Sequence, residues 1–276
     1  MTEPGRAVAR EIAAPKINLA LHVRGRRADG RHDIETLFAF CVDGDRLEGE
    51  CVPEAGLSLE LAGPFAGAIE GENLIARAYD LLAARVGGAG GGVRMRLDKR
   101  LPVASGIGGG SADAAAALRL LTSLWRSDPG QAMAVAPMLG ADVPACLLSL
   151  TARGEGVGDV LTPVFAEGVS GCPVLLVNPR EARSTAAVFG AWDGVDRGAL
   201  GEDWRGGRND LEAAARGLVP AIGDVLAWLG AQEGVTLARM SGSGATCFGL
   251  FDSEDARDAA ASACPEAWWQ LASVLR

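Results

Sequence analysis

The sequence predicts an α+β fold made of two domains. It contains segments in which apolar and polar residues alternate, as in half-buried strands, and segments with apolar residues at helical spacing. Glycine and proline interrupt both patterns near residues 168–173. We therefore expect an N-terminal domain over residues 1–167 and a C-terminal domain over residues 168–276. A chain of 276 residues is long enough to give each domain a core of its own.

The first hundred residues predict mainly strands. Residues 8–24 alternate with a break at Pro15, and residues 34–42 form a buried apolar run that indicates a strand or a strand pair. A turn-rich, basic loop over residues 24–31 lies between them. The other elements expected here are strands at 57–61 and 93–97, a helix at 73–85 and a flexible glycine-rich connector at 86–93.

The rest of the chain predicts helices around two glycine-rich loops. The first loop runs directly into an alanine-rich and leucine-rich helix within residues 101–124, and the second joins two strands within residues 238–251. The other expected elements are a helix at 132–139, a loop at 139–144, an apolar segment at 145–150, a strand at 173–179 and helices at 209–217 and 220–229.

Composition excludes several classes of protein. The formal charge of −9 disfavours a general nucleic-acid binder, which normally presents a basic face. No apolar run approaches the length of a membrane span, and the N-terminus lacks the apolar core of a secretory signal, so we expect a cytoplasmic protein. The six cysteines are far apart and there are two histidines, which predicts buried thiols in a reducing compartment and no zinc centre.

Lysine is scarce in this chain. Of 26 basic residues 24 are arginine, and the lysines are Lys16 and Lys99. A site that needs only positive charge would carry arginine in such a chain, so these two positions are candidates for sites that need a compact ammonium. The alternative is that both lysines lie on the surface without a specific role.

The loop from Gly106 to Ser111 predicts an anion site. Glycine occupies four of the five positions before Ser111, which lets backbone N–H groups approach a ligand closely. The following helix adds unpaired N–H groups and the positive end of its dipole. Ser111 is placed to cap this helix or to face a phosphate or Mg²⁺. An ordinary strand-to-helix turn would need fewer glycines, and the Walker and dinucleotide-binding patterns are absent.

Three segments resemble, in order and spacing, motifs of the GHMP kinases, which include galactokinase, homoserine kinase and mevalonate kinase. They are PKINLALHV at 15–23, LPVASGIGGGSADAA at 101–115 and SGSGA at 241–245. The segments RGRRADGRHDIETLF, ENLIARA, LGADVP, RNDLE and MSGSGATCF are similar to one branch of the family. That branch phosphorylates the 2-hydroxyl of 4-diphosphocytidyl-2-C-methylerythritol in the non-mevalonate route to isoprenoids.

The resemblance implies a fold, cofactors and catalytic residues. The N-terminal domain would resemble the second domain of ribosomal protein S5, and the C-terminal domain would be ferredoxin-like. ATP with Mg²⁺ would supply the phosphoryl group, and the metal would bind through ATP, with Ser111 as a candidate ligand. Lys16 and Asp142 match the catalytic lysine and aspartate that flank the acceptor hydroxyl, although a turn aspartate would also fit Asp142. The positions implied to bind ATP are Asn73, Lys99, Pro102, Val103, Ala104, Ser105, Gly106, Ile107, Gly108, Gly109, Gly110, Ser111 and Ala112.

The resemblance also implies a substrate site. Asn18 would orient the substrate, and as the second residue after Lys16 in a strand it shares the lysine's face. His32 would hydrogen-bond cytosine and Phe189 would stack on it. The family typically has tyrosine before this histidine, whereas this chain has Arg31, whose guanidinium can stack on a base in its place. The second glycine loop would close on the substrate through Ser241, Gly242, Ser243 and Gly244.

Two other readings remain open at this point. The chain could be another GHMP kinase, of the homoserine or mevalonate type, or a member of the fold that binds a ligand without turnover. The expected partner in the first reading is the cytidine diphosphate conjugate, with no nucleic acid and no membrane. We expect a monomer or a weak homodimer.

Overall fold

The computed structural model describes residues 8–87, 91–181 and 184–276. These residues form two compact units, and each unit is assembled from segments that are distant in the sequence. The first unit contains the chain up to Ala14, Gly44–Val103 and Gly109–Leu148. The second contains Pro15–Asp43, Ala104–Gly108 and Ser149–Arg276. These compact units differ from the sequential division at residue 168, which remains our proposal for the two family domains.

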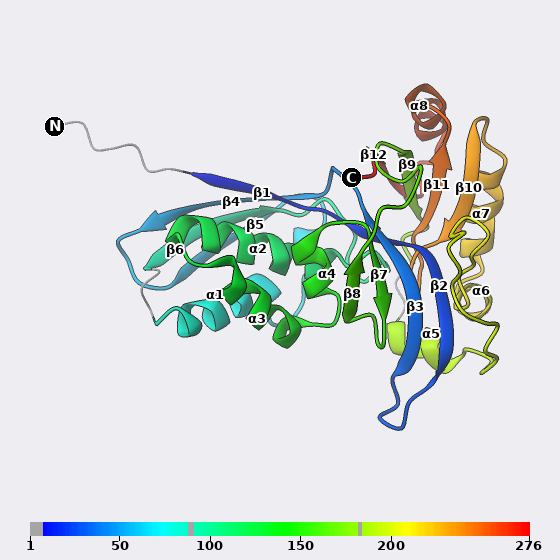
Figure 1. The fold of residues 1–276 in the computed structure, drawn as a ribbon. Coiled ribbons are helices and arrows are strands. Elements are labelled where there is room, and N and C mark those ends of the chain that lie inside the picture. Colours follow the sequence, from blue (N-terminus) through cyan, green and yellow to red (C-terminus); the bar gives the residue numbers. More distant parts are fainter. Residues whose placement is uncertain (1–7, 88–90, 182–183) are drawn as a thin grey trace. The chain divides into compact units, whose positions relative to one another are not determined.

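A four-stranded sheet with helices packed against it makes up the first unit (Figure 1). Strands β5 and β6 are parallel, and the other neighbouring strands are antiparallel. The strands, in spatial order, are β1 (Ala9–Ala13), β4 (Asp45–Val52), β6 (Gly92–Asp98) and β5 (Leu57–Ala62). The helices are η1 (Ala66–Ala68), α1 (Leu74–Arg85), α2 (Gly109–Trp125), α3 (Pro129–Leu139) and α4 (Val143–Leu148).

Helix α2 is the centre of this unit. Its residues from Ala112 to Leu118 are all buried, because a run of small alanine side chains allows neighbouring elements to approach closely. At Gly49 of β4 an added Cβ would lie 2.8 Å from the Leu120 side chain, so any larger residue would have to displace Leu120 where this helix crosses the strand. The close packing holds the start of α2 in a fixed place on the sheet.

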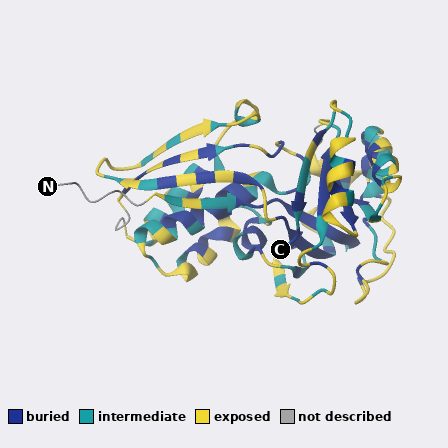
Figure 2. Cartoon of the chain, turned by 90° about the horizontal axis from the view of Figure 1, so that it is seen from above, coloured by how far each residue is buried: buried dark blue, intermediate teal, exposed yellow. Residues whose placement is uncertain are grey.

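The second unit contains two antiparallel four-stranded sheets. The outward faces of its helices are largely exposed and the strands beneath them are largely buried (Figure 2). One sheet consists of β2 (Lys16–Arg26), β3 (His32–Phe40), β7 (Ala152–Glu155) and β8 (Val160–Pro163). The other consists of β10 (Val235–Met240), β11 (Cys247–Phe251), β9 (Pro173–Asn178) and β12 (Trp269–Val274). The helices are α5 (Thr185–Gly190), α6 (Glu212–Leu218), α7 (Ala221–Gly230) and α8 (Glu254–Ser262).

Most of the expected elements are present, with corrections. The loop expected over residues 139–144 is helical from Val143, since proline fits the first turn of a helix. The helix expected from residue 209 begins at Glu212, because Asn209 and Asp210 bind strand β2 and its neighbours instead. All six cysteines are free thiols, but only Cys41, Cys146 and Cys247 are buried as expected; Cys172 and Cys264 are half-buried and Cys51 is exposed. Part of the connector expected at 86–93 lies outside the described residues.

Candidate active site

Lys16 begins strand β2 in the second unit, and the residue is only 5% exposed. Its Nζ donates a hydrogen bond to Oδ1 of Asn18 over 3.3 Å, as the two-residue period of a strand predicts. The same Nζ lies 4.7 Å from the centre of the Phe38 ring. A compact ammonium is therefore held between an amide oxygen and an aromatic face, which both favour positive charge.

The amide of Asn18 has one fixed orientation. Its Nδ2 donates to Oγ1 of Thr36 over 2.8 Å, and that hydroxyl donates to the carbonyl of Ala20 over 2.6 Å. This chain of donors turns Oδ1 of Asn18 toward Lys16. The backbone N–H of Asn18 also donates to Oγ of Ser241 over 3.2 Å, so the second glycine loop lies directly beside these residues.

Residues 104–108 of the first glycine loop pack on the second glycine loop, backbone against backbone. The N–H of Thr246 donates to the carbonyl of Ser105 over 3.1 Å, and Oγ of Ser241 donates to the carbonyl of Gly106 over 3.2 Å. Gly106 has a φ of 80°, and an added Cβ would lie 2.5 Å from the carbonyl oxygen of Gly244. The N–H of Lys16 donates to Ile107 as well, so this loop also contacts the start of β2.

Asn209 holds the second glycine loop from the other side. Its Nδ2 donates to the carbonyl oxygens of Met240 and Gly242, each over 2.8 Å. The hydroxyl of Ser243 hydrogen-bonds that of Thr185 over 3.1 Å. Sequence reasoning missed the structural role of Asn209. The motif RNDLE was visible, but the partners of its asparagine are about thirty residues further along the chain.

The second part of the predicted phosphate loop belongs to the first unit, where α2 begins at Gly109. Ser111 lies within the first turn and is half-buried, so it does not cap the helix as one reading predicted. The first turn contains no acidic residue, and Gly110 is exposed. A helix start with glycine backbone and no carboxylate fits a phosphate group.

The other predicted ATP-binding residues differ in exposure. Gly106 and Gly108 both have positive φ, which favours glycine, and Ala104 has a φ of 52°. Val103 and Ala104 are exposed. The buried positions of this set are Pro102, Ser105, Ile107 and Ala112.

Asn73 and Lys99 have observed structural partners. Asn73 is the N-cap of α1, and its Oδ1 accepts a hydrogen bond from the N–H of Ile75 over 2.8 Å. The ammonium of Lys99 is buried and contacts Asp45 over 2.6 Å and Asp113 over 2.5 Å. These contacts are observed, whereas a contact of either residue with adenine stays a prediction.

Asp142 directly precedes α4 in the first unit and is half-buried. Its carbonyl oxygen accepts a hydrogen bond from the N–H of Cys146 over 3.0 Å, so its backbone opens the helix. Its role in catalysis stays a prediction at this point.

His32 and Phe189, which come from β3 and α5, lie together in the second unit. Their ring centres are 4.9 Å apart, and the Trp192 ring meets His32 edge-on with a separation of 5.6 Å. Sequence reasoning missed Trp192, because nothing in the pattern around it separates it from a core residue. The three rings form an aromatic cluster, which is the kind of surface on which a base can stack.

Two features of its surroundings favour the neutral form of the His32 imidazole. Burial, together with the nearby charge of Arg26, lowers its pKa below the ordinary value. Nε2 accepts a hydrogen bond from Nε of Arg26 over 3.4 Å. Since a guanidinium can only donate, Nδ1 of the neutral ring carries the proton and is a donor.

Arg31 points toward Asp29 and not toward this cluster. Its Nε and Nη2 donate to Oδ2 of Asp29 over 2.9 and 2.7 Å, and its side chain is 62% exposed. The ion pair lowers the pKa of Asp29 and raises that of Arg31, chiefly through these hydrogen bonds. The predicted stacking of Arg31 on a base would require it to leave this partner.

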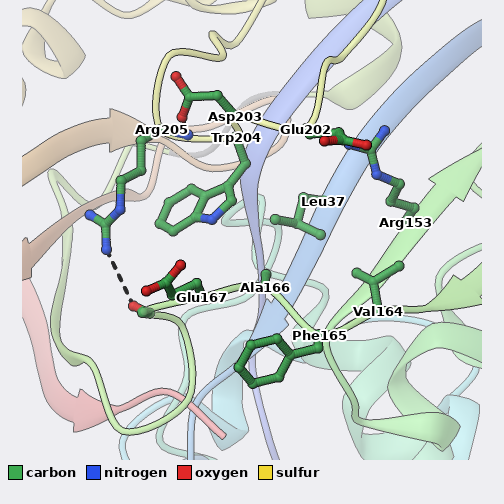
Figure 3. A pocket seen from close by; sticks show the side chains of 11 residues that line it. Leu37, Arg153, Val164, Phe165, Ala166, Glu167, Glu202, Asp203, Trp204 and Arg205 are labelled. Carbon is green, nitrogen blue, oxygen red and sulfur yellow. Dashed lines mark hydrogen bonds between the residues drawn. The ribbon is translucent and has the colours of Figure 1, made fainter.

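A separate pocket of about 680 Å³ in the second unit contains none of the predicted site residues (Figure 3). The guanidinium of Arg205 lies over the Trp204 ring at 4.5 Å and donates to the carbonyl of Gly168. Arg153 donates to the carbonyl oxygens of Leu200 and Gly201. Both cations of this pocket therefore have partners within the protein.

Comparison with known proteins decides the family. A model of the GHMP kinase N-terminal domain matches residues 73–149, and a model of the GHMP kinase C-terminal domain matches residues 196–269. The chain belongs to the GHMP kinase family. Membership implies that ATP is the phosphoryl donor.

Relatives of high identity carry one name, 4-diphosphocytidyl-2-C-methyl-D-erythritol kinase. The protein of that name from Rhizorhabdus wittichii is 56% identical over 96% of this chain and 94% of its own length. The one from Novosphingobium aromaticivorans is 50% identical over 99% of this chain and 95% of its own length.

Solved structures agree on the two-domain α+β fold. A 4-(cytidine 5'-diphospho)-2C-methyl-D-erythritol kinase is similar with a TM-score of 0.82 and 36% identity, covering 97% of this chain and 99% of its own. The mevalonate kinase of Methanococcus jannaschii has a TM-score of 0.70 at 10% identity, with 99% of each chain covered. At that identity the likeness concerns the fold alone.

Residues 8–87, 91–181 and 184–276 lack two features. None of the helices there is both long enough and apolar enough to span a membrane. The same residues contain no group of three or more His, Cys, Asp or Glu side chains arranged to hold a metal ion.

Proposed function

We propose that this GHMP kinase phosphorylates the 2-hydroxyl of 4-diphosphocytidyl-2-C-methyl-D-erythritol with ATP, giving the 2-phosphate and ADP. The reaction serves the synthesis of isoprenoid precursors by the non-mevalonate route. The observation that carries this proposal is the 56% identity to a relative of that name over 96% of the chain.

Lys16 and Asp142 are the proposed catalytic residues. An ammonium stabilises negative charge on the transferring phosphoryl group, and a carboxylate accepts or orients the proton of the attacking hydroxyl. The buried setting of Lys16 supports its role, since electrostatic interactions are stronger away from water. Asn18 supports it too, because its amide is fixed by Thr36 and can orient a hydroxyl.

The aromatic cluster of His32, Phe189 and Trp192 is the proposed cytosine site. Phe189 supplies a partly exposed ring for stacking, and Nδ1–H of the neutral His32 supplies a hydrogen-bond donor. Ser241, Gly242, Ser243 and Gly244 complete the proposed substrate site, as their loop adjoins Asn18. Arg31 belongs to the proposed site only if its guanidinium leaves Asp29 and stacks on the base.

The first glycine loop and the start of α2 are the proposed binding site for the phosphates of ATP. Mg²⁺ accompanies the nucleotide in this proposal, with the Ser111 hydroxyl as the ligand from this chain, because hydroxyl and phosphate oxygens suit this ion. Bound Mg²⁺ would neutralise charge on the phosphate oxygens. We further propose a cytoplasmic enzyme that is a monomer or a weak homodimer.

A coupled assay of ADP release tests the proposal. The acceptors are the cytidine diphosphate conjugate, homoserine and mevalonate, each with Mg²⁺ and ATP. We expect ADP release with the conjugate. Phosphorus NMR should show an equimolar amount of a new phosphomonoester at the 2-position of the conjugate. Robust turnover of homoserine or mevalonate would assign another activity of the family, and binding of the conjugate without ADP release would indicate a sensor.

A further inference from the structure

Lys99 is the centre of a buried ionic group in the first unit. Its side chain is 2% exposed, and Nζ contacts Oδ2 of Asp45 over 2.6 Å and Oδ2 of Asp113 over 2.5 Å. Burial alone would lower the pKa of Lys99, but the charges of Asp113 and Asp45 outweigh burial and raise it. The ammonium is therefore charged, and its partners offset the large cost of removing that charge from water.

This ionic group joins three segments that surround the start of α2. Asp45 begins β4, Lys99 follows the last residue of β6, and Asp113 is the fifth residue of α2. Oδ1 of Asp45 also accepts the backbone N–H groups of Arg100 and Leu101, over 2.5 and 2.8 Å. The sheet, the entry to the glycine loop and the second turn of the helix are thus fixed to one another.

The ammonium also lies close to the first residue of the helix. An ideal Cβ at Gly109 would be 3.4 Å from Nζ of Lys99. Any shift of the ammonium would therefore change the packing under the backbone that is proposed to meet phosphate. Arginine would fit poorly here, because its planar fork cannot occupy the site of a point charge between two carboxylates.

We propose that Lys99 is a positioning residue of the phosphate site, which holds the start of α2 and residues 100–101 in the arrangement that binds a polyphosphate. This inference rests on the proposed ATP-binding function. It differs from the contact with adenine that the family resemblance implies for Lys99. If Lys99 positions the phosphate site, its loss weakens binding of any polyphosphate; if it contacts adenine, its loss weakens binding only of ligands that carry the base.

The decisive experiment compares ATP with inorganic tripolyphosphate, which lacks the base and the sugar. Calorimetry on the full chain with Mg²⁺ measures the Kd of ATP, and displacement of ATP measures the Kd of tripolyphosphate. For Lys99→Met we expect the affinity for both ligands to fall by the same factor, at least tenfold. A loss of affinity for ATP alone would indicate that Lys99 contacts adenine and would overturn the positioning role. Unchanged affinity for both ligands would also overturn it.

Two further variants exclude a trivial loss of folding. Lys99→Met with Asp113→Leu removes the cation and one carboxylate together, so Asp45 keeps its two backbone donors. Asp98→Asn is the matched control, because Asp98 pairs with Arg100 in an exposed ion pair of the same segment. We expect the double variant to melt cooperatively and to lose both ligands equally, and Asp98→Asn to bind both as the wild type does. A folded double variant with normal affinity for tripolyphosphate would overturn the proposal.

Amide hydrogen exchange gives a readout that is independent of binding. Loss of the ionic group should speed exchange over Gly109–Leu118 in the free protein, and Asp98→Asn should leave it unchanged. Exchange that is equal in all variants would contradict the positioning role. Failure of the proposed ATP-binding function is separable, because the wild type would then bind neither ATP nor tripolyphosphate. Wild type that binds ATP but not tripolyphosphate would also count against a preformed phosphate site.

Discussion

The two lysines of the chain lie in different units, and both side chains are buried. The sequence made each of them a candidate for a site that needs a compact ammonium, because arginine is used at the other 24 basic positions. For Lys16 it also predicted the neighbour on the same face, Asn18, from the period of a strand. The partners of Lys99 were not predictable, since Asp45 and Asp113 are 54 and 14 residues away.

Replacing Asp142 with asparagine tests the proposed acid–base role. The substitution keeps the shape of the side chain but removes its charge and its proton acceptor. We expect turnover to fall about a hundredfold or more, with nearly unchanged affinity for ATP. Steady-state kinetics and calorimetry measure the two quantities, and Asp224→Asn on the exposed face of α7 is the control. Turnover within a few fold of the wild type would remove Asp142 from the mechanism.

Lys16→Arg tests the need for a compact ammonium. A planar guanidinium cannot occupy the space between Asn18 and the Phe38 ring without displacing one of them. We expect kcat to fall strongly while the melting temperature changes by only a few degrees. Arginine at this position with near-normal kcat would show that charge alone is sufficient.

Phe189→Ala tests the cytosine site. Base–aromatic stacking contributes about 1–3 kcal/mol, so kcat/KM for the acceptor should fall by roughly five- to 150-fold. The KM for ATP should hardly change. Phe165→Ala removes a ring that is 92% exposed elsewhere in the same unit and serves as the matched control. Equal effects of the two substitutions would contradict stacking on Phe189.

Asp113 predicts a pH dependence of stability. Burial raises the pKa of its carboxyl to about 7, despite the opposing charge of Lys99. The unfolded chain loses this proton near the ordinary pKa of 3.8, whereas the folded protein loses it near pH 7, above which Asp113 is the carboxylate that pairs with the Lys99 ammonium. Because the folded state binds more protons within this window, the contribution of Asp113 to stability decreases as pH rises from about 4 to 7.

Asp113→Asn cannot ionise and so lacks this decrease. We expect the melting temperature of the variant, relative to that of the wild type, to rise between pH 4 and 7 and to level off above pH 7. Thermal melts across this range measure the difference. A difference that is constant with pH would show that Asp113 titrates equally in the folded and unfolded states.

At the scale of elements, glycine is needed in the first glycine loop for two different reasons. Gly106 is required by the fold, because a Cβ there would collide with the backbone of Gly244. At Gly109 an added Cβ would have its nearest neighbours at 3.4 Å or more, which is ordinary van der Waals contact. In our proposal, glycine is needed at this position because a phosphate group must approach the backbone closely.

Parallel substitutions separate the two requirements. Gly106→Ala should lower the melting temperature by several degrees, since its backbone has a positive φ and no space for a methyl group. Gly109→Val should fold and melt nearly normally but bind ATP more than tenfold more weakly. Unchanged ATP affinity in a folded Gly109→Val variant would contradict the anion site.

Some elements could be predicted from the sequence and others could not. The anion loop was predictable, because glycine content and a following helix are local signals. Strand β4 was not assigned, although its buried and exposed positions alternate, since Gly49 and its acidic residues have low strand propensity. The burial of Asn209 depends on partners across the fold, which no local pattern specifies.

For the molecule as a whole, sheet pairing determines which residues form a unit. Strand β3 pairs with β7 through Thr36 and Gly154, which lie more than a hundred residues apart. This pairing places residues 15–43 in the same unit as the C-terminal half of the chain. Local patterns predicted the α+β class, and motif resemblance predicted the family, but the composition of the units requires these long-range pairs.

Discrimination between two acceptors is the most direct test of the proposed activity. The measurement is kcat/KM for 4-diphosphocytidyl-2-C-methyl-D-erythritol and for free methylerythritol 4-phosphate, under the same conditions with Mg²⁺ and ATP. We expect the conjugate to be favoured at least fivefold, since stacking of the cytosine alone contributes about 1–3 kcal/mol. Comparable kcat/KM for the two acceptors would contradict a cytidine-recognising kinase.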